Sequence, residues 1–345
     1  MKKREAVYGS VGSPDLERLS GEELSRFVSQ LFEERGRKAF EMAKAAILEE
    51  ANKLECKTTR EALRFFANYW TDTTRPALLS IACEALGGDP EATMPFAVPL
   101  MLVCGAIDIH DDIIDRSKTK ENHLTIYGKF GKEVALLIGD ALLFKGLVLL
   151  SEGKQNCNAE RLGKVMHVVK DLFFELGDSQ VLETSLKGRR DLKPKEYLSM
   201  VRKKAADFEA YMRVSAILAN GSEEETEALA HYGRTLGILT ILGDDNTDMF
   251  DASELLNRMK HEVLPLPMLY ALQQPDLKTK LLVKMQKRNI GKRDAERMCD
   301  LIYEAGTFDK TEHDIYEFIA IGQEALKNLK DGSLLSIILK STYPK

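Results

Sequence analysis

Two segments of the sequence carry acidic residues in a spacing that could bind metal ions. Each reads Asp-Asp-x-x-Asp, and the six residues are Asp111, Asp112, Asp115, Asp244, Asp245 and Asp248. On a helix, the first and last aspartates of this pattern are four apart, so their carboxylates lie on one face. Facing carboxylates repel each other unless a cation lies between them, and oxygen ligands select hard ions such as Mg²⁺. The pattern therefore predicts two clusters that hold several Mg²⁺ ions around one diphosphate.

The alternative for either cluster is a solvated helix end without a ligand. Asp near a helix C-terminus is unfavourable to the helix dipole, and both clusters follow long apolar runs, which argues against that alternative. Asp108 lies one turn before the first cluster and adds a fourth carboxylate there.

The residues around the clusters resemble a known family. HDDIIDRSKT, followed by YGKFGKEVALLIGDALLF, is similar to the trans-isoprenyl diphosphate synthases (polyprenyl synthetases), and DDNTD fits their second aspartate-rich motif. The resemblance extends from about residue 35 to the C-terminus. It implies an all-α, isoprenoid-synthase-type helical bundle with a central cavity, usually a homodimer, that acts on an allylic isoprenyl diphosphate.

The resemblance also implies roles for the aspartates. Three Mg²⁺ ions, held by Asp111, Asp115, Asp244 and Asp248, would grip the diphosphate and stabilise the charge that develops on it as the carbon–oxygen bond breaks. Catalysis is expected to depend on Asp111, Asp115 and Asp244. Supporting positions are expected at Asp112, Asp245 and Gln180; Gln180 lies in SQVLE, which resembles the family's GQxxD segment. Asp108 lies outside the family pattern and is expected to be exposed.

Basic residues are expected to bind the substrate diphosphate. The candidates are Lys120, Lys203, Arg75, Arg258 and Lys260. Lys203 matches the lysine of the family's KTA segment, with Lys204 in place of its threonine. Arg258 and Lys260 are offered as substitutes for a lysine-bearing loop that is shortened here. A plain surface charge is the alternative for each of them.

The second substrate site of the family, for isopentenyl diphosphate, is altered in this sequence. The family's GKRxRP becomes Thr71-Asp72-Thr73-Thr74-Arg75-Pro76, Cys104 replaces a histidine, and Glu121 replaces an arginine. Changing a lysine to Asp72 or an arginine to Glu121 alters the local charge by two units. At an effective dielectric of about 20, one misplaced charge at ~4 Å costs on the order of 4 kcal/mol. The sequence therefore predicts an impaired isopentenyl diphosphate site.

Three functions remain open on this evidence. The first, favoured by the impaired site, is an enzyme that ionises an allylic diphosphate of C15–C20 or longer and makes a terpene-synthase-like product. The second is a conventional chain-elongating synthase of the geranylgeranyl type. The third is a non-catalytic subunit of a partner synthase, which would not need two intact aspartate clusters.

The length of the isoprenoid tail is indicated by two small residues. Ala106 and Val103 precede the first cluster by about one and a half and two helical turns, where the tail would run. Their size would admit a C15–C20 or longer chain, although small core residues are also ordinary packing.

Helices are expected to position all of these residues. Apolar residues recur at three- and four-residue spacing throughout, and no strand is predicted. The expected helices are 21–51, 60–70, 76–86, 94–115, 132–151, 159–186, 194–219, 223–243, 253–272, 277–287, 292–305 and 310–329. The domain boundaries expected are a flexible extension over 1–20 and a single domain over 21–345.

Composition excludes several classes of protein. The net charge of −5, with both signs interspersed, argues against a nucleic-acid partner. Five scattered cysteines indicate reduced thiols, and the N-terminus lacks the apolar run of a signal peptide. The longest apolar stretches, such as 97–107, are too short for a membrane span. A cytoplasmic protein is expected.

Overall fold

The computed structural model describes residues 20–120, 123–155 and 157–343. The expected extension over 1–20 lies almost entirely outside these residues, as does Glu121. Within the described ranges the chain is nearly all helical, with one short hairpin of two antiparallel strands. The all-α fold class is confirmed.

The elements are α1 (Gly21–Lys53), α2 (Lys57–Tyr69), α3 (Thr74–Ala85), η2 (Pro90–Thr93), α4 (Met94–Ile114), β1 (Thr119–Lys120), β2 (His123–Leu124), α5 (Ile126–Phe130), α6 (Lys132–Ser151), η3 (Glu152–Gln155), α7 (Ala159–Leu186), α8 (Pro194–Lys204), α9 (Ala206–Ala219), α10 (Glu223–Phe250), α11 (Ala252–His261), α12 (Leu266–Ala271), α13 (Pro275–Met285), α14 (Lys292–Glu304), α15 (Thr307–Ala325) and α16 (Ser333–Ser341).

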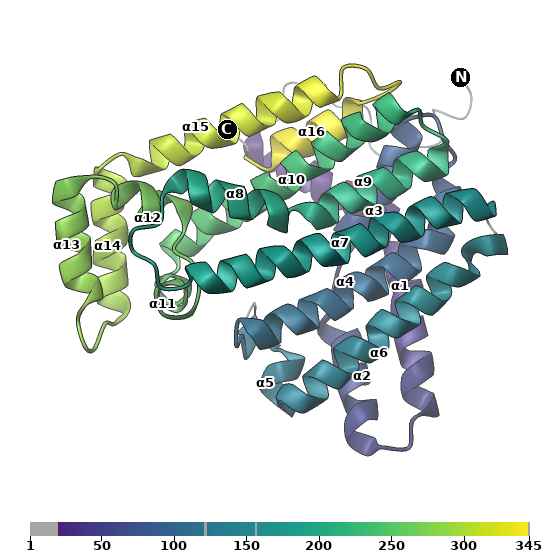
Figure 1. Ribbon diagram of the computed structural model, residues 1–345, viewed down its shortest axis with the longest axis horizontal. Helices are drawn as coiled ribbons and strands as arrows, with labels where there is room; N and C mark the ends of the chain where they lie inside the picture. Colours follow the sequence, from purple (N-terminus) through teal and green to yellow (C-terminus); the bar gives the residue numbers. More distant parts are fainter. Residues whose placement is uncertain (1–19, 121–122, 156, 344–345) are drawn as a thin grey trace.

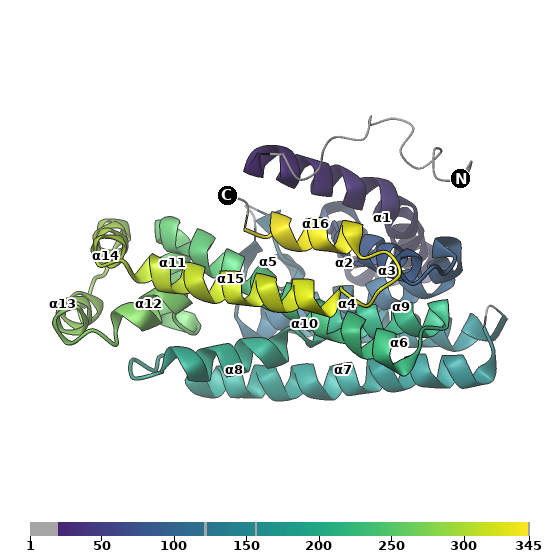
Figure 2. The same ribbon diagram turned by 90° about the horizontal axis from the view of Figure 1, so that it is seen from above.

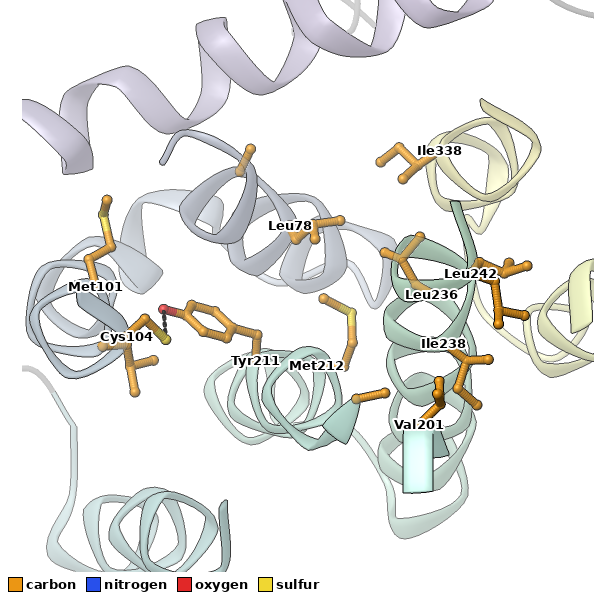
Figure 3. Packing of buried hydrophobic residues seen from close by; sticks show 14 of the residues in the cluster. Leu78, Met101, Cys104, Val201, Tyr211, Met212, Leu236, Ile238, Leu242 and Ile338 are labelled. Atoms are coloured by element: carbon orange, nitrogen blue, oxygen red, sulfur yellow. Dashed lines mark hydrogen bonds between the residues drawn. The ribbon is translucent and has the colours of Figure 1, made fainter. Parts of the chain in front are cut away.

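The helices pack around α3, α4, α9 and α10 (Figures 1 and 2). α4 packs against α6, α3 lies against both α1 and α9, and α10 lies between α9 and α15. The α13–α14 pair projects at one end of the long axis (Figure 1). Figure 3 shows the buried side chains of α3, α4, α9, α10 and α16 meeting between these helices. This frame brings the C-terminal part of α4 and that of α10 to the same region of the bundle.

Glycine lets α4 and α6 approach closely. A Cβ atom on Gly146 would lie 2.8 Å from the Pro99 carbonyl oxygen, and one on Gly139 would lie 2.4 Å from His110 Nε2. A larger residue at Gly146 would require movement of the α4 backbone, and one at Gly139 would require the His110 side chain to shift. The two glycines therefore set the depth at which α4, and with it the first aspartate cluster, is held against α6.

Local sequence signals explain the starts of the long helices. Ser20 and Ser222 each form a capping box at the N-terminus of α1 and α10, and Asn158 caps α7. α4 begins directly after a 3₁₀ turn and carries Pro95 in its first turn, where its missing N–H is not needed.

The predicted helices match the observed ones in outline, but two predicted segments divide, α10 continues past residue 243 to Phe250, and some short elements were not predicted. The segments 194–219 and 253–272 each divide into two helices, at Ala205 and at 262–265. The hairpin β1–β2, the short helix α5 and the C-terminal helix α16 were not predicted, because each is too short to show a clear period.

Two helical segments are long and apolar enough to cross a membrane by length and composition. In Pro90–Ile114, 72% of the most apolar window is buried inside the protein, whereas in Lys132–Ser151 the share is 33%. These segments exceed the stretch 97–107 on which the length argument was based. Burial explains the apolar character of the first, whereas α6 carries exposed apolar side chains.

Candidate active site

The first aspartate cluster lies at the C-terminal end of α4. The helix ends at Ile114, and Asp115 is its C-cap. The Gln180 amide of α7 donates a hydrogen bond of 2.6 Å to Asp111 Oδ1, and Lys187 Nζ lies 2.8 Å from Asp115 Oδ1. Gln180 therefore supports Asp111 as predicted, whereas the contact of Lys187 with Asp115 had no signal in the sequence.

The second cluster lies two turns before the end of α10. Asp245 is fully buried, and its Oδ2 accepts hydrogen bonds from the Tyr197 hydroxyl (2.6 Å) and the Leu266 backbone N–H (3.1 Å). Arg258 of α11 donates through Nη2 to Asp248 Oδ2 at 2.6 Å and lies 3.3 Å from Asp245 Oδ1. Asp245 thus anchors the end of α10 to α8 and α12, while Asp244 remains exposed at the rim.

One lysine acts electrostatically on both clusters. The exposed ammonium of Lys120, 3.9 Å from Asp112 Oδ1, lowers the pKa values of Asp111, Asp112 and Asp244 against larger opposing effects. Burial, together with neighbouring carboxylates, raises the pKa of Asp111 to about 6 and that of Asp112 to about 7. Burial and Asp248 raise the pKa of Asp244 to about 6, although its side chain reaches solvent. The charge of Lys120 therefore acts on carboxylates of both clusters, whose own burial and mutual repulsion favour the neutral form.

The charge of Lys204 acts on the first cluster, whereas Lys203 pairs with an exposed carboxylate. Lys203 forms an ion pair with Asp178 in which both side chains are largely exposed. Lys204 Nζ lies 2.6 Å from the buried Glu183 Oε2, and its positive charge lowers the pKa of Asp111. Consecutive helical residues point about 100° apart, so the two lysines face different neighbours, and the diphosphate-binding role of Lys203 stays a prediction.

The two basic candidates after the second motif differ in position. Arg258 contacts Asp245, Asp248 and Glu262, and is 15% exposed. Lys260, two residues later, is exposed on α11. Of these two substitutes, the structure brings Arg258 to the aspartates.

Arg75 occupies a separate group of charges between α3 and α9. Its Nη1 lies 3.0 Å from Asp72 Oδ2 and its Nη2 lies 2.9 Å from Asp207 Oδ2. Asp108 is partly buried and its charge acts on Arg75, which corrects the expectation that Asp108 is exposed. We call Arg75, Asp72, Asp207 and Asp108 the Arg75 cluster. Three carboxylates around one guanidinium leave it negatively charged where the family resemblance implied an anion site.

A tyrosine lies beside the Arg75 cluster. The Tyr211 hydroxyl contacts Cys104 Sγ at 3.4 Å, and both residues are buried (Figure 3). Cys104 is thus packed against an aromatic ring of α9.

The predicted tail-pocket residues are both buried in α4. Ala106 is 1% exposed and Val103 is fully buried. The Val103 side chain lies against the Gly146 position of α6, so it belongs to the α4–α6 interface. Their role in binding a tail stays a prediction.

The chemistry of the clusters fits a hard divalent ion. Their predicted ligands are carboxylate oxygens, which Mg²⁺ and Ca²⁺ prefer. Among the described residues, however, no three Asp, Glu, His or Cys side chains are already arranged around a point where an ion could sit. Lys187 and Arg258 instead lie on Asp115 and Asp248, at positions where a positive charge is favourable.

Comparisons with known proteins give the fold class and the family. The structure superposes on geranylgeranyl pyrophosphate synthetase from Pyrococcus horikoshii with a TM-score of 0.79 and 24% identity, covering 92% of this chain and 99% of that one. This likeness defines an isoprenoid-synthase-type helical bundle. The family model "Polyprenyl synthetase" matches residues 57–302, and the chain belongs to that family.

Two relatives are similar in sequence. A geranylgeranyl diphosphate synthase of Methanosarcina mazei is 33% identical over 58% of this chain and 61% of its own length. A short chain isoprenyl diphosphate synthase of Methanothermobacter thermautotrophicus is 30% identical over 64% of this chain and 68% of its own. The chain therefore spans less than two thirds of the first relative.

Proposed function

We propose that the protein is a chain-elongating isoprenyl diphosphate synthase that transfers the isoprenyl group of an allylic diphosphate to isopentenyl diphosphate. The observation that carries the proposal is the position of two aspartate clusters at the C-terminal ends of α4 and α10, in a chain that matches the polyprenyl synthetase family over residues 57–302. The family membership and the names of the relatives favour this reaction over the terpene-synthase-like one that the sequence favoured.

In this proposal Asp111, Asp115, Asp244 and Asp248 hold Mg²⁺. The bound ions supply electrostatic stabilisation of the diphosphate as it leaves. Lys204 and Lys120 add positive charge beside the departing group. Gln180 fixes the orientation of the Asp111 carboxylate, and the hydrogen bonds from Tyr197 and Leu266 hold Asp245, which keeps the end of α10 in place.

A second candidate, ionisation without isopentenyl diphosphate, is favoured by the Arg75 cluster. Arg75 is the basic residue retained from the family's GKRxRP segment, and Asp72 and Asp207 both bind it. An incoming diphosphate would have to displace a carboxylate before it could use this guanidinium.

Product analysis separates the two candidates. Each allylic diphosphate is incubated with Mg²⁺, with and without isopentenyl diphosphate. The proposal predicts a longer diphosphate when isopentenyl diphosphate is present. A hydrocarbon or alcohol of unchanged length, formed equally well without it, would support the second candidate.

A homodimer is also proposed. Leu137, Phe144 and Val148 lie at i, i+7 and i+11 on α6 and are 66%, 69% and 51% exposed. They form one apolar face on a helix whose composition is otherwise that of a buried one, and such a face is typical of an interface. Phe144→Glu should convert the dimer to a monomer in light scattering, whereas a monomeric wild type would contradict the proposal.

A further inference from the structure

A basic side chain lies on the last aspartate of each cluster. Lys187 contacts Asp115, and Arg258 contacts Asp248. The proposed function places metal ions on both of these aspartates.

Lys187 is held at its backbone and reaches Asp115 with a long, partly exposed side chain. It follows α7 directly, its N–H donates to the Glu183 carbonyl at 3.1 Å, and Gly188 reverses the chain with a φ of +74°. The side chains of Lys187 and Asp115 are 19% and 13% exposed. A lysine ammonium on a flexible four-carbon stem can therefore move by several ångströms without moving α7.

A metal on the same carboxylate competes with this contact. The Lys187 ammonium lies 2.8 Å from Asp115 Oδ1, and a Mg²⁺ ion bound to that oxygen would repel it. Metal binding therefore favours departure of Lys187 from Asp115. A diphosphate bound by the metal would offer the displaced ammonium a new anionic partner.

Arg258 differs from Lys187 in the number of carboxylates that it contacts. Besides Asp248 it contacts Asp245 and Glu262. Loss of Asp248 would leave it two carboxylates. In the part of the chain that the structure describes, Lys187 is paired with the Asp115 carboxylate alone.

We propose that Lys187 occupies Asp115 in the metal-free protein and binds the substrate diphosphate after Mg²⁺ has taken that carboxylate. Lys187 thus competes with the metal in the absence of substrate and assists diphosphate binding in its presence. This inference rests on the proposed function only in that both place Mg²⁺ and a diphosphate at the aspartate clusters.

The test measures two binding constants by calorimetry on the full chain. The variant is Lys187→Met, and the control is Lys170→Met, which removes an exposed lysine of the same helix that pairs with Asp171. Mg²⁺ is titrated alone, and inorganic diphosphate is titrated in saturating Mg²⁺. Lys187→Met should bind Mg²⁺ alone several-fold more tightly and inorganic diphosphate about tenfold more weakly. The control should change neither constant.

The proposed role predicts opposite changes in the two binding constants, whereas a purely structural role does not. If Lys187 only fixes the ends of α4 and α7, the variant should weaken both ligands, and that result would overturn the proposal, as would two unchanged constants. Lys187→Arg should retain diphosphate binding, and Lys187→Gln, which keeps a donor toward Asp115, supplies a second variant should the methionine one fold poorly.

The outcome is separable from that of the proposed function. A wild type that binds Mg²⁺ and diphosphate but does not elongate would refute the synthase and leave the role of Lys187 standing. A wild type that elongates, with both constants unchanged in Lys187→Met, would refute the role of Lys187 alone.

Discussion

The aspartate clusters and the Arg75 cluster are built from the same kinds of side chain but serve opposite needs. Around the clusters, eight carboxylates face four basic side chains, a formal charge of −4; the basic residues are Lys120, Lys187, Lys204 and Arg258, and Glu183 and Glu262 are the carboxylates outside the two motifs. In the Arg75 cluster three carboxylates face one arginine.

The two regions differ in whether their expected ligand would neutralise their negative charge. Metal ions can neutralise the excess negative charge of the aspartate clusters. In the Arg75 cluster, Asp72 and Asp207 are hydrogen-bonded to the arginine, and a diphosphate would add to the negative charge. An excess of carboxylates therefore indicates a cation site in the first region and a barrier to an anion in the second.

The largest effect is expected from the metal ligands. Asp111→Ala or Asp244→Ala should lower the rate of diphosphate release by about 100- to 1000-fold, because each removes a ligand that stabilises developing charge. Helical content by circular dichroism should not change. Asp171→Ala, on the exposed face of α7, is the control. Full activity in either cluster variant would show that the clusters do not bind the metal together.

Removing a negative charge beside Arg75 should improve binding of the second substrate. Asp207→Asn removes one negative charge but keeps the shape of the contact with Arg75, so the KM for isopentenyl diphosphate should fall by about tenfold. Asp72→Lys combined with Glu121→Arg should act in the same direction. Glu227→Gln, which alters the exposed partner of Arg213, is the control. An unchanged KM in Asp207→Asn would mean that the second substrate binds elsewhere.

The metal-free protein should lose stability as the pH rises. The pKa values of Asp111, Asp112 and Asp244 are raised from 3.8 to about 6, 7 and 6. A raised carboxyl pKa contributes stability below the unfolded value, near 4, and that contribution is lost as the pH passes through the folded values. With EDTA, the Tm should therefore be lower at about pH 8 than at about pH 5.

Two further measurements complete this test. Mg²⁺ should raise the Tm more at the higher pH, where the carboxylates are ionised, and Asp112→Asn should reduce the slope of Tm against pH. A Tm that rises with pH in EDTA, equally in wild type and Asp112→Asn, would contradict the assignment.

The smallest effect is expected from substitutions at Ala106, the predicted contact of the isoprenoid tail. Ala106→Phe places a ring at a site that is 1% exposed, so we expect shorter products and a loss of about 1–3 kcal/mol in the free energy of unfolding. Ala106→Ser, which changes volume little, should leave product length unaltered. The same product length in Ala106→Phe would place the tail elsewhere.

Much of the fold could be predicted from the sequence, because long helices show their period. The boundaries of α6 and α7 agree with the prediction, whereas α16 was missed because nine residues give too few repeats. Spacing placed Asp111 and Asp115 on one face. It could not show which of Lys203 and Lys204 points inward, since that depends on the rotation of α8 against α7.

Contacts between distant segments were not predictable. Asp207 lies 132 residues from Arg75, and Lys187 lies 72 residues from Asp115. Nothing local marks either residue, because each acquires its partner only when the helices pack. The altered GKRxRP segment signalled a changed site, but the residue that completes it, Asp207, lies on another helix.

The most direct test of the account is the length of the product formed with and without isopentenyl diphosphate. Purified protein, Mg²⁺ and farnesyl diphosphate are incubated under both conditions, and the products are separated by mass before and after phosphatase treatment. The account predicts a diphosphate longer by one or more isoprene units only when isopentenyl diphosphate is present. A product of unchanged length under both conditions, with inorganic diphosphate released in each, would contradict it.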